Sequence, residues 1–386
     1  MTVNVKEERH TVRKLIFIFS SLIYKLFSLI PIKKDRIIME CDYGKGFYGN
    51  LLYIYKEIEK RNLTVEIIIP LNKGITIDVN NVKVVKTRTP LHLYYLATSK
   101  YWITNNHYYH FLKKRSGTIM INTWHAMGAF KRFGIDSAKS EEEINRFERD
   151  SKNIDYLLVS SSELRSIYSK ALNVEENKIL SMGIPRTDVL INEEEIEKAR
   201  IRFYNKYPSL KDKKLILYAP TFRDDEKEYF NMQLNLKLLK NNFGDNYKFI
   251  FKLHPIIRNS YEIDDEVKDF VIDMGKENIN DLMIVSNCLI TDYSSVIFEY
   301  SLLKKPMAFF TYDFHKYKEE LRNFYFHFED FIPGEMMNTT EEIVTFINNA
   351  AMGDFDIDRI NSFSSRFCEY KDGEASKRFV DYFLNF

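Results

Sequence analysis

The sequence predicts an α/β protein with two doubly wound, Rossmann-like domains whose mostly parallel sheets face a shared cleft. Three observations lead to this prediction. A length of 386 residues suits two domains, each with its own core. Short apolar runs alternate with helical patterns almost throughout the chain, which is typical of βαβ units. A charged helical stretch at residues 193–206, followed by Pro208, separates two sets of such runs.

The N-terminal segment, residues 1–34, carries an apolar run between basic clusters. It holds seven basic residues and two acidic ones, and the run extends from Leu15 to Ile30. Lys25 and three serines make the run too polar for a transmembrane span, and residues 31–34 contain no small-residue cleavage site. An amphipathic helix that lies on an anionic membrane surface fits these features best. A buried N-terminal helix is the alternative.

The two predicted domains contain the strands. Residues 35–195 form the first domain, with strands expected at 36–41, 64–70, 82–86, 101–104, 118–123, 156–160 and 179–182. Residues 196–372 form the second, with strands expected at 214–219, 248–253, 270–273, 288–291 and 307–311. Residues 373–386 form a last helix that we expect to pack back on the first domain. Ligands of such sheets bind beyond the C-terminal ends of the strands, and the unusual short motifs of this chain all follow strands.

Composition excludes several classes of protein. Hydrophobic residues make up 45% and charged residues 29% of the chain, as in globular proteins rather than disordered or membrane-integral ones. A net charge of +1 gives no reason to expect nucleic acid as a partner. Cys41, Cys288 and Cys368 are too far apart for metal-ligand spacing, so we expect buried thiols in a reducing compartment. We expect no metal and no other cofactor.

The most informative motif is the turn at residues 292–295, Asp-Tyr-Ser-Ser, between an apolar strand and a helical pattern. Asp292, Ser294 and Ser295 bring two hydroxyls and free backbone N–H groups to a helix N-terminus, where a phosphate can bind without a metal. The same residues also make an ordinary helix cap, and the spacing alone does not separate the two hypotheses. Glu299 lies about one helical turn deeper, where it could accept hydrogen bonds from sugar hydroxyls.

A histidine at a strand end is the candidate general base. His125 follows the strand at residues 118–123, with Gly128, Lys131, Arg132 and Gly134 after it. Histidine can remove a proton from an alcohol near neutral pH, and the two cations supply positive charge. A structural histidine that satisfies a loop carbonyl is the alternative.

Two motifs of the second domain also follow strands. Lys252 and His254 alternate along one strand and therefore point to the same face, where they bind phosphate or are merely solvated. Thr221 and Arg223 follow another strand, and arginine can form paired hydrogen bonds to a phosphate. Asp224 and Asp225 invite a metal site, but no third ligand has convincing spacing.

Two further motifs in the first domain have weaker interpretations. Gly44, Gly46 and Gly49 match Gly-x-Gly-x-x-Gly, but the next strand ends without the carboxylate that a dinucleotide site requires. A loop that receives an acceptor, or a plain turn, fits better. Arg186, in the segment Gly183–Asp188, lines the cleft or marks a hinge between the domains.

Together these motifs resemble the CDP-glycerol glycerophosphotransferase family, the teichoic acid primases and polymerases of Gram-positive bacteria. The resemblance extends from about residue 36 onward. Its anchors follow the order of the family's motifs: Trp124-His125-Ala126 with Lys131 and Gly134, Gly183-x-Pro185-Arg186-x-Asp188, Tyr218-Ala219-Pro220-Thr221-x-Arg223-Asp224-Asp225, Lys252-x-His254-Pro255, and Thr291–Ser295.

The resemblance implies a GT-B fold and a transfer of glycerol phosphate or ribitol phosphate. CDP-glycerol or CDP-ribitol would be the donor, an undecaprenyl-linked glycan the acceptor, and CMP the leaving group, at the cytoplasmic face of the membrane. His125 would be the general base and His254 a second essential histidine. The donor would contact residues of the second domain: Thr221, Arg223, Lys252, Asp292, Ser294, Ser295 and Glu299. The acceptor or its phosphates would contact Gly44, Gly46, Lys131, Arg132 and Arg186.

Several alternatives stay open at this point. The residues after His125, Ala126-Met127-Gly128-Ala129, depart from the primase pattern, so the choice between glycerol and ribitol, and between primase and polymerase, is undecided. A nucleotide-sugar glycosyltransferase of the same fold would use similar phosphate contacts. A non-catalytic protein of the membrane surface would explain the N-terminal segment alone. Homo-oligomers are compatible with each hypothesis.

Overall fold

The computed structural model describes residues 2–109, 111–223, 228–254, 257, 259, 261–317 and 324–384, and the side chains of residues 2–13 lie outside that description. The chain divides into two compact units. The first unit comprises residues 1–126, 133–186 and 374–386, and the second comprises residues 127–132 and 187–373. The domain boundary expected after residue 195 falls inside helix α6 (Glu193–Lys206) of the second unit.

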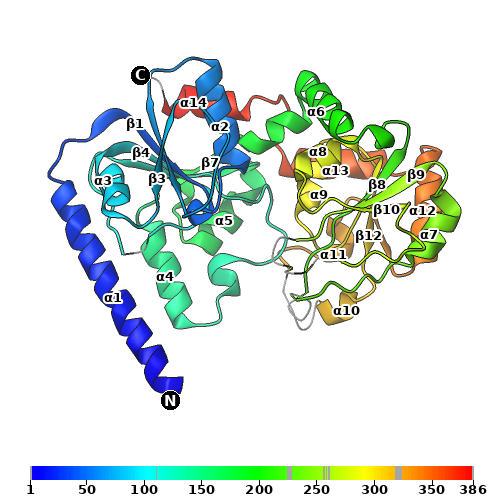
Figure 1. Ribbon diagram of the computed structural model, residues 1–386, viewed down its shortest axis with the longest axis horizontal. Helices are drawn as coiled ribbons and strands as arrows, with labels where there is room; N and C mark the ends of the chain where they lie inside the picture. Colours follow the sequence, from blue (N-terminus) through cyan, green and yellow to red (C-terminus); the bar gives the residue numbers. More distant parts are fainter. Residues whose placement is uncertain are drawn as a thin grey trace. The chain divides into compact units, whose positions relative to one another are not determined.

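The first unit is built on a parallel sheet, shown in Figure 1. In the described part of the chain this sheet has seven strands in the order β3-β2-β1-β4-β5-β6-β7. The strands are β1 (Lys33–Glu40), β2 (Glu66–Leu71), β3 (Val82–Lys86), β4 (Ser99–Thr104), β5 (Ile119–Asn122), β6 (Tyr156–Val159) and β7 (Ile179–Ser181). The helices are α1 (Thr2–Phe27), α2 (Gly49–Lys60), α3 (Pro90–Thr98), α4 (Glu141–Ser151), α5 (Arg165–Leu172) and α14 (Ala375–Phe383).

The second unit contains another parallel sheet, with the order β10-β9-β8-β11-β12-β13 among the described residues. Its strands are β8 (Lys214–Tyr218), β9 (Tyr247–Phe251), β10 (Val271–Asp273), β11 (Cys288–Thr291), β12 (Met307–Phe310) and β13 (Glu335–Met337). Its helices are α6, α7 (Leu236–Phe243), α8 (Ile279–Val285), α9 (Val296–Ser301), α10 (Phe314–Lys316), α11 (Phe328–Phe331), α12 (Thr340–Ala351) and α13 (Ile357–Phe367). The α/β class with two parallel sheets is confirmed.

All twelve predicted strands are present, and β13 was not predicted. β13 has three residues, Glu-Met-Met, and lies at the edge of its sheet beside β12. Neither β-branched residues nor alternation distinguishes this segment from a loop. The three cysteines are buried free thiols, as expected.

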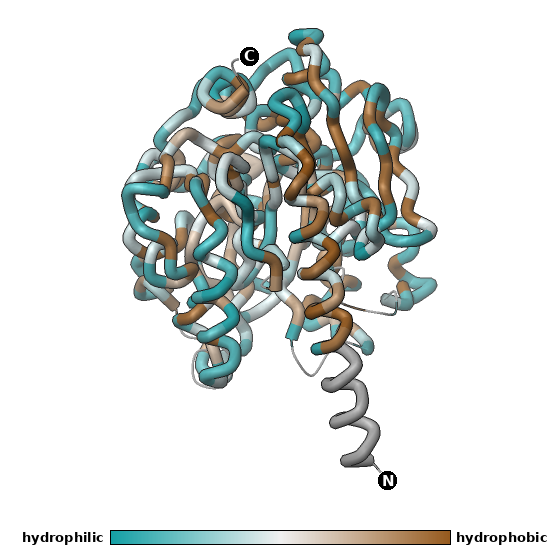
Figure 2. Tube along the Cα trace, turned by 90° about the vertical axis from the view of Figure 1, so that its left-hand side faces the viewer, coloured by the Kyte–Doolittle hydropathy of each residue, from teal (hydrophilic) through white to brown (hydrophobic). Residues whose placement is uncertain are grey.

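Two helices at the ends of the chain pack on the first unit. Phe379 and Phe383 of α14 belong to the core that contains residues of β1, β2 and α2. The C-terminal helix α14 therefore packs against helix α2 of the first unit. Helix α1 packs along α3 and buries Tyr24 against Trp102. The other face of α1 exposes apolar side chains, among them Leu15, Phe19, Leu22 and Leu26 at 58–66%. Figure 2 shows the described part of this helix on the side that faces the viewer, with brown apolar residues along it.

Candidate active site

The sheet of the second unit brings five predicted donor-site residues to one edge. The strand order reverses between β8 and β11, which pair side by side in parallel. Thr221 and Arg223 follow β8, while Asp292, Ser294 and Ser295 follow β11. Open α/β sheets bind ligands at such a switch point. The two motifs therefore meet where a ligand of this unit is expected.

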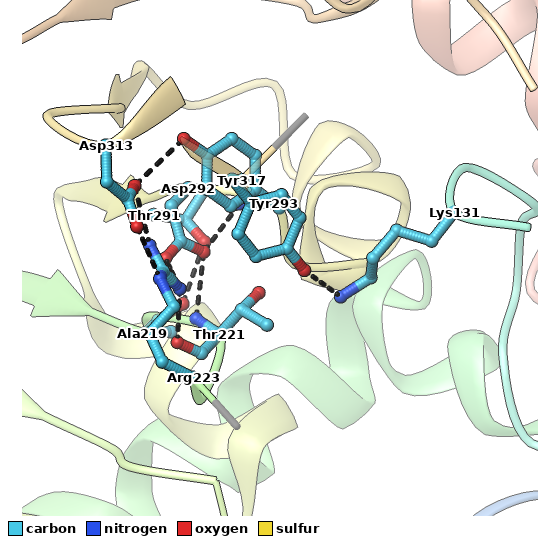
Figure 3. Close-up of polar contacts among 9 residues, drawn as sticks. All are labelled: Lys131, Ala219, Thr221, Arg223, Thr291, Asp292, Tyr293, Asp313 and Tyr317. Carbon is cyan, nitrogen blue, oxygen red and sulfur yellow. Dashed lines mark hydrogen bonds and ion pairs between the residues drawn. The ribbon is translucent and has the colours of Figure 1, made fainter. Parts of the chain in front are cut away.

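The guanidinium of Arg223 forms hydrogen bonds with groups of its own chain. Arg223 is 5% exposed. Its Nη1 donates to the carbonyl of Thr221 at 2.7 Å and to Asp292 Oδ2 at 2.9 Å. Its Nε and Nη2 donate to the two carboxylate oxygens of Asp313 at 2.7 and 3.1 Å, as drawn in Figure 3. Burial acts to lower the pKa of Arg223, but the charges of Asp292 and Asp313 outweigh it and raise that pKa.

The carboxylate of Asp292 joins two turns. Its Oδ1 accepts hydrogen bonds from the backbone N–H groups of Thr221 at 2.8 Å and Tyr293 at 2.5 Å. Tyr293 in turn donates its hydroxyl to Asp313 Oδ1 at 3.0 Å. The network fixes the turns that follow β8, β11 and β12 (Figure 3). This geometry favours a positioning role for Arg223 and Asp292 over the direct phosphate contacts that the sequence suggested.

Hydroxyl groups at the same edge are better placed to meet a ligand. The Oγ1 atom of Thr221 is buried and has no hydrogen-bond partner among the described residues. Among the described contacts, Ser294 Oγ accepts a single long bond, 3.4 Å, from the N–H of Val296. Ser295 begins α9 without a side-chain cap bond in the described structure. The helix cap is therefore weak, and these hydroxyls and N–H groups suit an anionic ligand.

The remaining residues predicted for the donor lie on neighbouring elements. Lys252, after β9, donates to the carbonyls of Gly275 and Glu277 at 2.8 Å each. Its amine therefore bonds to backbone, and burial lowers its pKa. His254 is exposed, with its ring 4.8 Å from the ring of Phe222. Glu299 is buried in the first turn of α9.

The segment 127–132, which follows His125 in sequence, packs within the second unit. Phe130 stacks on Phe324 at 4.8 Å and on Phe331 at 5.2 Å between ring centroids. Lys131 donates its Nζ to the hydroxyl of Tyr317 at 3.5 Å, a contact visible in Figure 3. The exposed Arg132 lies 6.0 Å from the ring of Tyr325. Lys131 therefore contacts a tyrosine whose ring stacks on Tyr293 of the 292–295 turn.

His125 lies in the first unit, in the loop after β5. Solvent reaches its ring, and its Nδ1 lies 3.3 Å from the carbonyl oxygen of Asn105, which follows β4. A carbonyl can only accept, so Nδ1 carries the proton and Nε2 is left with a lone pair. The ring also packs on Trp124 with centroids 4.4 Å apart. The imidazole is therefore held in the tautomer that a general base needs.

The surroundings of this imidazole favour its neutral form. Desolvation by the surrounding protein lowers the pKa of His125 below its ordinary value, and the positive charge of Arg186 lowers it further. The hydrogen bond to Asn105 opposes this effect in part. A neutral histidine at physiological pH is the form that accepts a proton. Arg186, predicted to contact phosphate, lies close enough to His125 to act on its charge.

The glycine loop after β1 is a strained turn. Asp42, Tyr43 and Gly44 all have positive φ, of 42°, 56° and 80°. A Cβ on Gly44 would lie 2.4 Å from the side chain of Thr87, so both the conformation and the space require glycine there. Gly46 has no such constraint on φ. Backbone strain of this kind occurs at ligand sites, and this loop lies at the switch point between β1 and β4.

Three residues of these networks were not predicted. Asp313 binds Arg223, Asn105 accepts from His125, and Asn50 donates to the carbonyls of Thr123 and Trp124 beside His125. Their signal in the sequence is weak, because a single Asp or Asn in a turn or at the start of a helix is common. Asp224, Asp225 and Pro255 of the predicted motifs lie outside the described residues. Within the described part of the chain, no group of three or more His, Cys, Asp or Glu side chains could hold a metal.

Fold and site together define a class of protein: a two-unit α/β transferase candidate with hydroxyl-bearing turns at the strand ends of one sheet and a histidine after a strand of the other. The chain matches the family model for CDP-glycerol:poly(glycerophosphate) glycerophosphotransferase over residues 22–385. The chain belongs to this family, and the predicted resemblance is confirmed.

Relatives in this family include primases and polymerases of both alditols. The chain is 34% identical over 382 residues to the teichoic acid poly(ribitol-phosphate) polymerase of Bacillus spizizenii, covering 97% of this chain and 60% of that protein. It is 33% identical to the teichoic acid ribitol-phosphate primase of the same species, covering 94% of each. It is 31% identical to a teichoic acid poly(glycerol phosphate) polymerase of that species, covering 96% of this chain and 98% of that protein.

Solved structures agree with the family assignment. A variant of the wall teichoic acid polymerase TagF aligns with a TM-score of 0.86 at 28% identity, covering 98% of this chain and 97% of that one. A TagF variant soaked with CDPG aligns with a TM-score of 0.85 at 28% identity, covering 98% and 97%. A UDP-GlcNAc 2-epimerase from Neisseria meningitidis, at 12% identity and a TM-score of 0.55, covers 91% of this chain and 100% of that one and shares the fold alone.

Proposed function

We propose that this protein is a CDP-alditol alditolphosphotransferase of teichoic acid synthesis. It transfers glycerol phosphate or ribitol phosphate from the CDP-linked donor to a terminal hydroxyl of a lipid-linked acceptor and releases CMP. The observation that carries the proposal is the family match over residues 22–385. Relatives named for ribitol phosphate and for glycerol phosphate lie at similar identity, so the donor class is the CDP-alditols.

The proposed chemistry is an in-line displacement at phosphorus. The acceptor hydroxyl oxygen forms a bond to the β-phosphorus, which bears the alditol, and the bond from that phosphorus to the bridging oxygen breaks. The electron pair leaves on the phosphate of CMP. His125 Nε2 takes the hydroxyl proton, because Nδ1 points to the carbonyl of Asn105. The mechanism invokes no cofactor.

The second unit is proposed to bind the donor. Thr221 Oγ1 and the hydroxyls and N–H groups of Ser294 and Ser295 would contact the pyrophosphate, with His254 stabilising the charge that develops on it. Glu299 would reach the ribose. Arg223, Asp292 and Lys252 would hold the turns that carry these groups, since each bonds to its own chain. A GT-B arrangement, with one active site served by both units, is part of this proposal.

The first unit is proposed to bind the acceptor and the membrane. Gly44, Gly46 and Arg186 of this unit would contact the acceptor near His125, while Lys131 and Arg132, which belong to the second unit, would bind its phosphates. The exposed apolar face of α1 would enter the headgroup region of an anionic membrane as a peripheral anchor. A cavity of about 410 Å³ near α1 supports this, because Lys113, Lys114, Arg149 and Lys152 line it. Among the described residues no helix is long and apolar enough to span a bilayer.

Product analysis with two variants tests the proposal. Purified protein is incubated with CDP-glycerol or CDP-ribitol and a lipid-linked acceptor, and CMP is measured. His125→Ala should reduce CMP release by at least about 1,000-fold while leaving the donor Kd unchanged, because it removes the base and not the phosphate contacts. Thr221→Val should raise the donor Kd about tenfold, since it replaces one hydrogen-bonding hydroxyl with a methyl group.

Three results would contradict the proposed reaction or the proposed residue roles. Release of a nucleoside diphosphate from a nucleotide sugar, with no CMP from either CDP-alditol, would identify a glycosyltransferase. Full activity in His125→Ala would remove the base assignment but leave the reaction class intact. An unchanged donor Kd in Thr221→Val would place the diphosphate elsewhere.

A further inference from the structure

Asn50 has no part in the chemistry proposed so far, yet all of its amide contacts converge on the two loops around His125. It is the second residue of α2 and is 2% exposed. Its Nδ2 donates to the carbonyls of Thr123 and Trp124, both at 3.0 Å. Its Oδ1 accepts from the backbone N–H of Arg186 at 3.2 Å. One side chain therefore ties the loop after β5 to the loop after β7.

The loop that Asn50 holds has an uncommon backbone. Trp124, immediately before His125, has φ of 52°, in the left-handed region that bulky side chains rarely adopt. Its N–H donates to Asn122 Oδ1 at 2.8 Å. The carbonyl of Trp124 receives a second, longer bond of 3.3 Å from Thr123 Oγ1. Among the described contacts, Asn50 is the only group that bonds to the carbonyl of Thr123.

We propose that Asn50 is a positioning residue for the transfer reaction. By fixing the left-handed turn at Trp124, it sets the direction in which Nε2 of His125 points, and it holds the backbone of Arg186 next to that histidine. This inference rests on the proposed role of His125 as the base. It extends that role to a residue that touches neither substrate nor reacting atoms.

Two substitutions of Asn50 disturb the turn in different ways. Asn50→Ala removes both donors and the acceptor, so the buried carbonyl of Thr123 and the N–H of Arg186 each lose their hydrogen bond to Asn50. Asn50→Asp keeps the acceptor for Arg186 but places negative charge against two carbonyl oxygens. Both changes free the turn at Trp124, whereas neither touches the donor site of the second unit.

Asn153 offers a matched control in the same unit. It is 6% exposed, and its side chain accepts from the N–H of Lys114 and donates to the carbonyl of Leu112, both at 2.9 Å. Asn153→Ala therefore removes a similar buried amide that bridges backbone groups in a loop away from His125. A soluble acceptor analogue keeps membrane binding out of the assay.

Steady-state kinetics, donor binding and thermal unfolding decide the question. We expect Asn50→Ala and Asn50→Asp to reduce kcat about 100-fold, the usual cost of a small misplacement of a catalytic group, with the donor Kd unchanged. Asn153→Ala should lower Tm about as much as Asn50→Ala but keep kcat within about threefold of wild type. A kcat near wild type in Asn50→Ala, or an equal loss in Asn153→Ala, would overturn the proposal.

Fluorescence gives a readout that does not depend on turnover. The chain has two tryptophans, so Trp102→Phe leaves Trp124 as the single indole, in contact with His125. Protonated imidazole quenches indole emission, so a pH titration of Trp124 emission follows the protonation of His125. The ring of His107 lies 5.4 Å from Trp124 and could also contribute a step. His125→Asn removes the His125 step and thereby separates the two signals. Adding Asn50→Ala should abolish the His125 step. Persistence of that step would show that the contact survives without Asn50 and would refute the proposal.

The kinetics also separate this inference from the proposed function. If His125→Ala abolishes CMP release and Asn50→Ala does not reduce it, the base assignment stands and the positioning role fails. If His125→Ala is fully active, the base assignment itself fails, whatever Asn50→Ala does.

Discussion

Arg223 shows how a residue of the predicted site acquires its role from its neighbours. The guanidinium bonds to Asp292 and Asp313, both on turns of the same sheet edge, and to the carbonyl of Thr221. Removal of this arginine would leave the buried carboxylate of Asp292 without its cation, which is costly. We therefore expect Arg223 to shape the turns that carry Thr221, Ser294 and Ser295, rather than to bind phosphate directly.

The charge of Arg186 should set the acid limb of the pH profile. The pKa of His125 is lowered first by desolvation and then by Arg186. A general base works in its neutral form, so activity falls as pH drops through the pKa of His125. Arg186→Gln removes the positive charge and should raise the pKa of His125. The acid limb of kcat should then move to higher pH, so the variant should keep a smaller fraction of its plateau activity at pH 6 than wild type does.

The control for this measurement is Arg200→Gln, which removes an exposed arginine of α6 in the second unit. Its profile should coincide with that of wild type. If Arg186→Gln lowers the plateau without moving the acid limb, Arg186 contacts a substrate phosphate and does not tune the histidine. If both variants move the limb equally, the effect reflects net charge alone.

The sequence predicted that several candidate site residues follow neighbouring strands, because the ends of apolar strands can be recognised in a sequence. Each motif follows an apolar run, and parallel strands bring those ends to one edge, so Thr221 and Asp292 could be placed together before any coordinates. The sequence did not predict that Asp313 binds Arg223 or that Asn50 bonds to Thr123. Asp313 is 90 positions from Arg223, and Asn50 is 73 positions from Thr123, and such separations leave no periodic signal.

Among the secondary-structure elements, helix α1 combines a face that packs on the first unit with a face that is exposed. The sequence offered a membrane-surface helix and a buried helix as alternatives. In the structure Tyr24 packs on Trp102 at 6.2 Å and Ser21 donates to the carbonyl of Phe111, whereas Leu22 and Leu26 are 58% and 64% exposed. One side of the helix therefore belongs to the core, and a deletion of α1 would damage the fold as well as any anchor.

Point substitutions on the exposed face test the anchor without that damage. Leu22→Glu combined with Leu26→Glu places two carboxylates where apolar side chains would meet anionic lipid. We expect the fraction that floats with vesicles containing anionic lipid to fall at least about tenfold, because both apolar burial and charge attraction are lost. Activity on a soluble acceptor analogue should be unchanged.

A matched substitution on the second unit controls for surface charge. Ile201 is an exposed apolar residue of α6, at 53%, and Ile201→Glu should leave flotation intact. Loss of flotation in Ile201→Glu, or its retention in the α1 double variant, would argue against α1 as the anchor.

On the scale of the whole molecule, each unit has a core of its own, although the chain crosses between them more than once. The second unit contains residues 127–132, and the first contains residues 374–386, so each unit includes a segment distant in sequence from the rest. Phe130 packs among Phe324 and Phe331, and Phe379 packs in the core of the first unit. Sequence periodicity identified these helices and strands, but not the short segment that joins the other unit, because no pattern marks it.

Separate cores predict separate responses to matched core mutations. Phe379 in the first unit and Phe249 in the second are both 0% exposed. Phe379→Ala and Phe249→Ala should each destabilise their own unit by about 4 kcal/mol, the usual cost of a large cavity. CDP-glycerol at about 100 times its Kd should stabilise the unit that binds it by about 2.7 kcal/mol. Calorimetry should therefore show that Phe249→Ala lowers a transition that the donor raises, while Phe379→Ala lowers a transition that does not respond to the donor. If both variants lower one and the same transition equally, the two units unfold as one. If the donor raises the transition that Phe379→Ala lowers, donor binding belongs to the first unit.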